Sequence, residues 1–377
     1  MPEKARAMLD LQKELDKRKQ GVMLVVRLLN KDELNILLDE PSKVIEKFYT
    51  IVDIACQQAT EHKIIRAATP TTLYVLIPDN IKIAEKLAYS IYSQVQLYVD
   101  SDFPESYLKC SVGSIQFPHV AEISAHKLLS MLSYGMFISS DKSYYYSYDD
   151  NPVDVEGLRT QNKKLNLLRS SLFKKKAKFM YQPIVDRKTG KIMYYECLLR
   201  VKDEDSNWLS VGPMIGDAES KGLISIVDFT VVEMAILELY HDKKITLSVN
   251  ISNIGVLNKR LLQRIETLLK KYDVAKRLII EITETSLNQD FQTTKKFIDC
   301  LHNYGCKFAL DDFGSGFTSF KQLLNLPIDI IKIDGSYIRD ILNNNHSKFF
   351  VEALIKLAAD LGIKTVAEFV ENGEIAR

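Results

Sequence analysis

The feature that most constrains the fold is a repeated alternation of strand-like and helical segments that begins at Phe179. Segments with the helical spacing of apolar residues, such as Val227–Tyr240 and Phe291–Tyr304, lie between most of the strand-like runs. This alternation predicts a parallel sheet that is covered by helices. The expected strands are Phe179–Val185, Ile192–Val201, Thr246–Ile251, Leu278–Thr283, Phe308–Leu310, Ile328–Ile333 and Thr365–Phe369.

The first two expected strands depart from this pattern, because only Asp186–Lys191 separates them. A parallel crossover requires about a dozen residues or more, whereas a short polar segment suits an antiparallel hairpin. We therefore expect an α/β fold in which residues 177–377 form a barrel of the TIM type. Its first strand should run antiparallel to its second.

Polar side chains lie at or near the carboxyl end of every expected strand from the second onward. In a parallel α/β barrel these ends meet at one rim, where functional groups gather. Any one such residue is more often a solvated side chain or a helix cap, so Asp311 alone could be a cap and Lys332 alone a surface lysine. The joint pattern favours a site. Its members, in chain order, are Glu196, Arg200, Asn250, Glu281, Glu284, Asp311, Asp312, Lys332, Asp334, Glu368 and Glu371.

Two of these carboxylates, Glu281 and Glu368, stand between apolar residues in hydrophobic strands. Burial of carboxylates without partners is unfavourable, and cations remove that cost. Hard oxygen ligands suit Mg²⁺ or Mn²⁺, and the sequence has no His–Cys cluster that would indicate structural zinc. The oxygen ligands exceed the need of one ion. We therefore expect two metal ions, an arrangement that activates water against a phosphodiester.

The adjacent pair Asp311 and Asp312 is unusual, because neighbouring side chains of a strand point to opposite faces. We expect the strand to end at this pair and the backbone to turn through Phe313–Gly316, since glycine permits such a turn. Both carboxylates could then reach one site, where metal ions would relieve their repulsion.

Composition and charge exclude several other classes of protein. The chain has 377 residues, of which 46% are hydrophobic, so two domains with a sizeable core are possible. The formal net charge of +1 argues against a binder of nucleic-acid polymers or of membrane surfaces. We expect no membrane span and no signal peptide. The five scattered cysteines suit reduced thiols in a cytoplasmic protein.

The region before the barrel divides into three parts. Residues 1–20 are a charged segment of helical character, and their apolar stripe suits a solvated or packing helix and a stalk or interaction helix about equally. Residues 21–150 alternate strand-like and helical runs, which predicts a small α/β domain with an edge strand within Tyr144–Asp150. Residues 151–176 should form a linker helix rich in Lys and Arg.

Short motifs in the second half of the chain resemble those of the EAL-domain cyclic-di-GMP phosphodiesterases. The signature stands as YECLLR (Tyr195–Arg200), with Cys197 in place of the usual alanine. The motifs follow the family's order and cover about residues 160–377. The others are YQPIV (Tyr181–Val185), SVNIS (Ser248–Ser252), EITET (Glu281–Thr285), DDFGSGF (Asp311–Phe317), IKIDGSYI (Ile331–Ile338) and VAEFVEN (Val366–Asn372).

The resemblance implies a role for each residue of the rim. The metal ligands would be Glu196, Asn250, Glu281 and Asp311 for one ion, and Asp311, Asp312 and Glu368 for the other. The catalytic residues would be Lys332, which orients or deprotonates the attacking water, together with Glu196 and Glu284. The residues that contact guanine or phosphate would be Gln182, Arg200 and Asp334. The loop that Glu284 fixes would be Gly314–Ser319, which contains Gly314, Ser315 and Gly316, and it would be a mobile lid that reports on dimerisation.

The implied reaction is hydrolysis of cyclic di-GMP to linear pGpG, by in-line attack of metal-bound hydroxide on phosphorus, in a homodimeric bacterial signalling protein.

Three features depart from the family. Cys197 replaces a residue that is not a ligand, and the loop GSGFTSF keeps the glycines of the family's GTGYSSL but lacks its tyrosine hydroxyl. The chain stops at Arg377, after the seventh strand, so we expect a C-terminally truncated barrel that lacks its last strand and exposes strand edges.

Residues 21–150 resemble, in topology, the GGDEF cyclase domain that often precedes EAL. Val22–Leu29 suits its first strand, Arg66–Leu73 stands in the place of the signature, and CSVGSI (Cys110–Ile115) suits a late strand. The glycines and acidic metal ligands of the signature are missing. We expect a degenerate GGDEF-like domain without cyclase activity, which serves in support, regulation or dimerisation.

Three functional hypotheses follow. The first is a metal-dependent cyclic-di-GMP phosphodiesterase, which the retained metal-side residues favour. The second is a catalytically silent cyclic-di-GMP receptor or regulatory interaction protein, which the missing last strand favours. The third is a general phosphodiesterase. Because the first two would both bind cyclic di-GMP, only turnover separates them.

Overall fold

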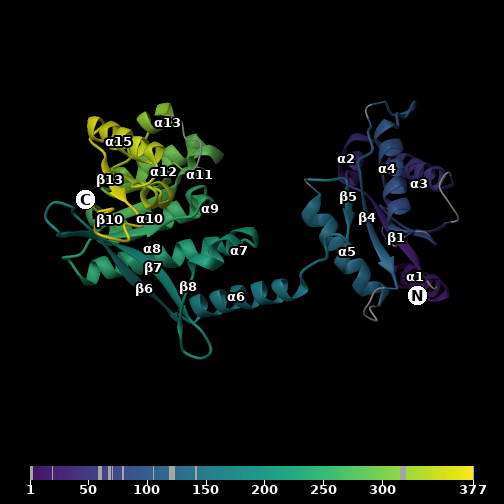
Figure 1. Ribbon diagram of the computed structural model, residues 1–377, viewed down its shortest axis with the longest axis horizontal. Helices are drawn as coiled ribbons and strands as arrows, with labels where there is room; N and C mark the ends of the chain where they lie inside the picture. The colour runs from purple at the N-terminus through teal and green to yellow at the C-terminus, as the bar shows by residue number, and fades with distance from the viewer. Residues whose placement is uncertain are drawn as a thin grey trace. The chain divides into compact units, whose positions relative to one another are not determined.

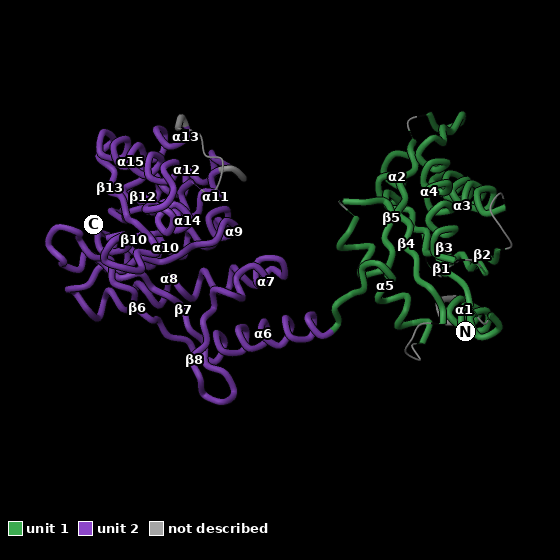
Figure 2. Tube along the Cα trace, viewed as in Figure 1, with its two compact units in different colours: residues 1–155 green, residues 156–377 purple. Residues whose placement is uncertain are grey.

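The computed structural model describes residues 3–18, 20–57, 62–66, 69, 71–78, 80–104, 106–118, 124–140, 142–314 and 320–376. The chain forms two compact units, Met1–Val155 and Glu156–Arg377 (Figure 2). Two predicted segments lie partly outside the described residues. These are Arg66–Leu73, at positions 67, 68 and 70, and the glycine loop, at Ser315 and Gly316. None of the helices within the described ranges combines the length and the apolar character that a membrane span requires.

The first unit is a five-stranded sheet in the order β2-β3-β1-β4-β5, in which only β4 and β5 run parallel (Figure 1). Its strands are β1 (Gly21–Leu28), β2 (Lys63–Arg66), β3 (Thr72–Ile77), β4 (Cys110–Phe117) and β5 (Tyr145–Ser147). Its helices are α1 (Glu3–Lys17), α2 (Lys31–Leu37), α3 (Pro41–Gln57), α4 (Ile81–Leu97) and α5 (Ala125–Ser139).

Alternate residues of the central strand β1 belong to two separate cores, because successive side chains of a strand point to opposite faces. Val22, Leu24 and Val26 pack with α3 and α4, whereas Met23 and Val25 pack with α1 and α5. All five side chains are fully buried. The sheet is therefore covered on both faces by apolar helix surfaces.

Helix α1 packs on the first unit, as expected for a packing helix. Leu11 is fully buried, and the Gln12 side chain accepts a hydrogen bond of 3.1 Å from the backbone N–H of Ala125 in α5. At the other end of the unit, β5 is an edge strand of the sheet. The edge strand predicted within Tyr144–Asp150 is thus confirmed.

The second unit is built on an eight-stranded sheet in the order β13-β12-β11-β10-β9-β7-β6, with β8 paired to β7. Its strands are β6 (Ala177–Val185), β7 (Ile192–Lys202), β8 (Trp208–Ser210), β9 (Leu247–Asn250), β10 (Leu278–Thr283), β11 (Lys307–Phe313), β12 (Ile330–Ile333) and β13 (Lys364–Ala367). Its helices are α6 (Val155–Phe173), α7 (Ile215–Ser220), α8 (Ile224–His241), α9 (Asn253–Val256), α10 (Lys259–Lys271), α11 (Glu284–Gln289), α12 (Phe291–Asn303), α13 (Phe320–Leu324), α14 (Gly335–Arg339) and α15 (Asn345–Asp360).

The strand directions confirm the predicted hairpin. Strands β6 and β7 pair antiparallel, and each pair from β7 to β13 along the sheet is parallel. Among the described residues no pairing joins β13 to β6, so the sheet is an open, TIM-like half-barrel. Helix α6, predicted as a linker, contributes Leu165, Leu168 and Leu172 to the core of this unit.

Candidate active site at the carboxyl ends of the strands

The side chains that face the inside of the half-barrel form two layers. The lower layer consists of Tyr194, Ile279, Ala309 and Ile330, with Ile184 and Val366 packed against it. Along the parallel strands, the residue two positions further on points to the same face. The residues two positions beyond those of the lower layer form a polar upper layer. They are Glu196, Glu281, Asp311, Lys332 and Glu368. The strand periodicity therefore brings the predicted residues of five strands to one rim.

Lys332 of β12 contacts four carboxylates of the upper layer. Its Nζ donates hydrogen bonds to Glu281 Oε2 at 2.7 Å and to Glu196 Oε2 at 3.3 Å. It also forms ion pairs of 2.9 Å with Asp311 Oδ1 and Glu368 Oε1. The side chains of Lys332 and Glu281 are 2% and 0% exposed. A single buried ammonium thus connects β7, β10, β11, β12 and the segment after β13.

The upper layer carries more negative charge than Lys332 can neutralise. Burial lowers the pKa of Lys332, but the surrounding carboxylates outweigh burial and raise this pKa above its usual range. Burial also raises the pKa of Glu281, and repulsion from Glu196 and Asp311 adds to this rise although Lys332 opposes it. Four carboxylates therefore compete for one cation, and further cations would relieve the excess charge.

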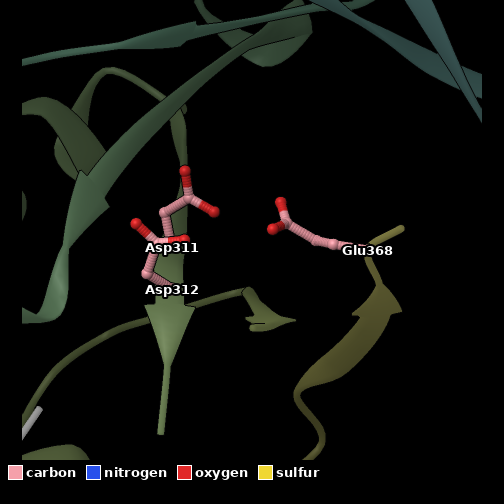
Figure 3. A group of neighbouring side chains, drawn as sticks. All are labelled: Asp311, Asp312 and Glu368. Carbon is pink, nitrogen blue, oxygen red and sulfur yellow. The ribbon is translucent and has the colours of Figure 1, made fainter. Parts of the chain in front are cut away.

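Asp311 and Asp312 lie at one site because the backbone bends at Asp312. Strand β11 continues to Phe313, one residue beyond its predicted end, and Gly314 follows in a turn with a φ of 104°, while the rest of the predicted turn, at Ser315 and Gly316, lies outside the described residues. Asp312 has a φ of 53°, in the left-handed region that aspartate tolerates better than most residues, and the pairing with β12 shifts register at this point. This irregularity breaks the alternation of side chains. The carboxylate of Glu368 extends toward the pair from the segment that follows β13 (Figure 3).

Glu368 is held in place through the residue that follows it. Phe369 has a φ of 49°, and its ring packs on Gly335, where an added Cβ would lie only 2.1 Å from a ring carbon. The guanidinium of Arg339 lies 4.4 Å from the centroid of the same ring. These contacts fix the chain after β13 and so direct Glu368 toward Lys332.

The residues present fit the metal ions that the sequence predicts. Asp311, Asp312 and Glu368 each place one carboxylate oxygen within 4.8 Å of the others. Oε1 of Glu281 is buried and has no hydrogen-bond partner in the described part of the chain, so it remains available as a ligand. Carboxylate oxygens are the ligands that Mg²⁺ and Mn²⁺ prefer.

Two further predicted residues flank Glu196. Asn250, at the end of β9, donates its Nδ2 to Glu196 Oε1 at 3.0 Å. Gln182, which is exposed, lies opposite Glu196 in the antiparallel register of β6 and β7. Both residues therefore lie beside the rim carboxylates.

Two of the residues predicted to contact substrate make only local hydrogen bonds in the contacts described. Nη1 of Arg200 donates to the backbone carbonyl of Leu199 at 3.0 Å. Asp334 caps α14, where its carboxylate accepts a hydrogen bond of 2.8 Å from the backbone N–H of Ser336. Arg200 and Asp334 are not among the partners of Lys332.

Glu284 lies at the start of α11 and contacts the beginning of the glycine loop. Its Oε2 accepts a hydrogen bond of 3.2 Å from the backbone N–H of Gly314, and the Tyr337 hydroxyl donates to the Gly314 carbonyl at 2.9 Å. Gly314 has a φ of 104°, and an added Cβ there would lie 2.9 Å from the rings of Tyr337 and Phe350. Glycine is therefore required at this position.

A buried polar network, which we did not predict, supports the loops after β9 and β10. Asp228 of α8 is 2% exposed and accepts hydrogen bonds from the backbone N–H and the hydroxyl of Ser252, at 3.0 and 2.6 Å. Burial outweighs these bonds and raises the pKa of Asp228 to about 6. Oδ1 of Asn253 accepts hydrogen bonds from Thr283, at 2.9 Å, and from Ser286. The only signal in the sequence was an aspartate within an apolar helical segment.

The sequence is similar to a known protein family and to characterised proteins. The sequence profile of the EAL domain matches residues 166–377. The chain is 32% identical over 217 residues to the cyclic di-GMP phosphodiesterase PdeF of Escherichia coli (strain K12), which covers 56% of this chain and 29% of PdeF. It is 29% identical over 299 residues to the cyclic di-GMP phosphodiesterase PdeB of Shewanella oneidensis, which covers 77% of this chain and 35% of PdeB. The chain thus spans about a third of the length of these relatives.

Solved structures share the fold. The PaMucR phosphodiesterase in its c-di-GMP complex has 27% identity and a TM-score of 0.53, over 57% of this chain and 89% of that chain. An EAL domain protein from Listeria monocytogenes EGD-e has 28% identity and a TM-score of 0.51, over 56% and 85%. The S helix-GGDEF-EAL portion of Vibrio cholerae LapD has 19% identity and a TM-score of 0.54, over 99% and 89%, which is a likeness of fold alone.

Proposed function

The chain belongs to the EAL-domain family, and from this premise we propose that it hydrolyses cyclic di-GMP to linear pGpG with the help of two divalent ions, Mg²⁺ or Mn²⁺. The observation that carries the proposal is the group of four carboxylates within 2.7–3.3 Å of the buried Lys332 ammonium. The relatives named as cyclic di-GMP phosphodiesterases support the choice of substrate.

In this proposal the rim residues divide between two ions. The ligands of one ion are Glu196, Asn250, Glu281 and Asp311, and those of the other are Asp311, Asp312 and Glu368. Ions at these positions supply Lewis acidity toward the phosphate and lower the pKa of a bound water. The protein contributes the rigid placement of the ligands, through the bend at Asp312 and the packing of Phe369 on Gly335.

Lys332, Glu284 and the residues at the substrate act without binding metal. Lys332 would orient the attacking water and stabilise negative charge on the phosphate, because its ammonium is held at the centre of the rim. Glu284 would hold the start of the glycine loop through Gly314. Gln182, Arg200 and Asp334 would contact guanine or phosphate, and the planar fork of an arginine suits a phosphate.

Turnover by the purified protein tests the proposal. With Mg²⁺ or Mn²⁺ the wild type should form pGpG, and excess chelator should abolish the reaction. Asp311→Asn and Glu196→Ala should each lower the rate by at least about a hundredfold with an unchanged circular dichroism spectrum. The matched control is Asp299→Asn, a surface carboxylate paired with Lys295, which should leave the rate unchanged.

Equal turnover in Asp311→Asn would contradict the assignment of the metal site. Binding of cyclic di-GMP without turnover by the wild type would instead support a catalytically silent receptor. Equal turnover of other cyclic dinucleotides would support a general phosphodiesterase.

For the first unit we propose a degenerate GGDEF-like domain without cyclase activity. The likeness of fold to the S helix-GGDEF-EAL chain of LapD, over 99% of this chain, supports this assignment. We also propose that the protein acts as a homodimer. Incubation with GTP and Mg²⁺ should yield no cyclic di-GMP, and light scattering should give twice the monomer mass of 43.1 kDa. Cyclase activity, or a monomeric mass, would contradict the respective proposal.

A further inference from the structure

Three buried oxygens in and beneath the layer of Lys332 have neither a hydrogen bond nor an ion pair within the described part of the chain. They are the hydroxyl of Tyr194, the hydroxyl of Ser248 and Oε1 of Glu281. The three residues are 6%, 0% and 0% exposed, respectively. Buried polar groups in folded proteins nearly always bond to protein or to ordered water. Three unpartnered oxygens in one region therefore indicate that they share a hydrogen-bond partner other than the protein, such as ordered water.

The strand register places these oxygens on neighbouring strands. Ser248 of β9 lies beside Glu196 of β7 and beside Ile279 of β10. Tyr194 precedes Glu196 by two residues and Glu281 follows Ile279 by two, so the side chains share the inward face. After burial, the charge of Glu281 contributes most to raising the pKa of Tyr194, as expected for a close neighbour.

The three groups have complementary hydrogen-bonding capacity. A phenol donates, a serine hydroxyl both donates and accepts, and a carboxylate only accepts. Lys332 already bonds to Oε2 of Glu281, which leaves Oε1 for another donor. Buried waters typically make two to four hydrogen bonds to such otherwise unpartnered groups. Since a carboxylate oxygen has two lone pairs, Oε1 can accept a hydrogen bond and still bind a metal ion.

We propose that Tyr194 and Ser248 are positioning residues that hold Oε1 of Glu281 through one buried water. This inference rests on the proposed function, because it assigns the two hydroxyls to the orientation of a metal ligand. Groups that hydrogen-bond to ligands in this way change metal affinity about 10–100-fold. Tyr194 and Ser248 thus set how tightly the rim binds metal without touching the ion themselves.

Calorimetric titration of Mn²⁺ into the metal-free full-length protein tests this inference. Tyr194→Phe and Ser248→Ala should each weaken Mn²⁺ binding about tenfold. The double variant should bind Mn²⁺ with nearly the same affinity as the single variant that binds it less tightly, because both hydroxyls act through the same water. The matched control is Tyr195→Phe, which removes a hydroxyl from the next residue of β7, on the opposite face of the strand, and should leave Mn²⁺ affinity unchanged.

The free energy of unfolding of the metal-free variants separates positioning from packing. If the hydroxyls make no hydrogen bond, their removal should leave Mn²⁺ affinity unchanged and should not destabilise the protein. That result overturns the inference, as does a loss of stability with unchanged Mn²⁺ affinity. A wild type that binds no Mn²⁺ would overturn the proposed function together with the inference. Normal binding by the wild type and by both single variants would overturn the inference alone.

Discussion

The two units bury polar side chains in different ways. In the first unit, Asn30 and Asp100 bond to the backbone of nearby loops, at 2.9–3.3 Å, and so replace the water that these backbone groups would lose. In the second unit, Lys332 and the carboxylates around it bond to one another and leave an excess of negative charge. The first arrangement completes a fold, whereas the second leaves negative charge that further cations would neutralise. The comparison therefore assigns the chemistry to the second unit.

The largest expected effect is on catalysis, from neutralising the buried carboxylate of the rim. Glu281→Gln keeps the size of the side chain and its acceptor for Lys332 but removes a charged metal ligand. The turnover number should fall by about a thousandfold, which corresponds to ~4 kcal/mol of transition-state stabilisation. Steady-state assays of pGpG formation at saturating Mn²⁺ check this. Unchanged turnover would contradict the claim that the buried carboxylates of the second unit take part in catalysis.

Removal of the buried ammonium of the rim should lower stability. Lys332→Met leaves buried carboxylates without their counter-ion, and the free energy of unfolding of the metal-free protein should fall by about 4 kcal/mol. Mn²⁺ should restore part of this loss, because it supplies positive charge at the same place. Urea unfolding with and without Mn²⁺ measures both effects.

A matched surface lysine provides the control for this substitution. Lys295→Met removes an exposed partner of Asp299 and should change stability by less than about 1 kcal/mol. If Lys332→Met were equally harmless in the metal-free protein, the rim would not hold the excess charge described above.

Asp228 sharpens the comparison, because this buried carboxylate of the second unit bonds to a loop, as polar residues of the first unit do. Its pKa of about 6 in the folded protein lies above the ordinary value of 3.8. The folded state therefore keeps its proton where the unfolded state has lost it. The contribution of Asp228 to stability is greatest below about pH 4 and falls, by up to roughly 3 kcal/mol, as the pH rises to about 6.

Asp228→Asn has no proton to lose and retains an acceptor for Ser252. The stability difference between variant and wild type should therefore move in favour of the variant between about pH 4 and pH 6. Urea unfolding at several pH values in this range measures the shift. If the free energies of unfolding of the two proteins changed with pH in parallel, the proton of Asp228 would make no contribution to stability.

The smallest effect is expected in the first unit. Asn30 donates to the Tyr107 carbonyl at 2.9 Å and accepts from the Lys109 N–H at 3.0 Å. Asn30→Ala should lower the free energy of unfolding by about 1–2 kcal/mol, because these backbone groups lose their partner. Mn²⁺ affinity should stay at the wild-type value. A loss of Mn²⁺ binding in the folded variant would show that the two units do not divide their roles in this way.

Much of the second unit could be predicted from the sequence, because its arrangement follows from short-range rules. The alternation of strands and helices indicates a parallel sheet, and the short Asp186–Lys191 segment indicates the hairpin of β6 and β7. The side chains of Glu196, Glu281, Asp311 and Lys332 meet because the carboxyl ends of parallel strands lie at one rim.

Other features depend on packing between distant segments. The left-handed conformation of Asp312 arises where the pairing of β11 with β12 shifts register, and nothing in the local sequence requires it. Tyr194 and Ser248 look like ordinary interior residues until the structure shows that their hydroxyls have no partner in its described part. The burial of Leu11, which attaches α1 to the first unit, likewise depends on contacts with distant segments.

The most direct test of the central claim is a calorimetric titration of Mn²⁺ into the wild type and into Asp311→Asn. The claim is that the rim of the second unit binds two divalent ions that share Asp311. The wild type should bind two Mn²⁺ ions per chain, and Asp311→Asn should bind both ions at least about tenfold more weakly, because the shared ligand loses its charge. Two ions bound by Asp311→Asn with wild-type affinity, or no Mn²⁺ bound by the wild type, would contradict the account.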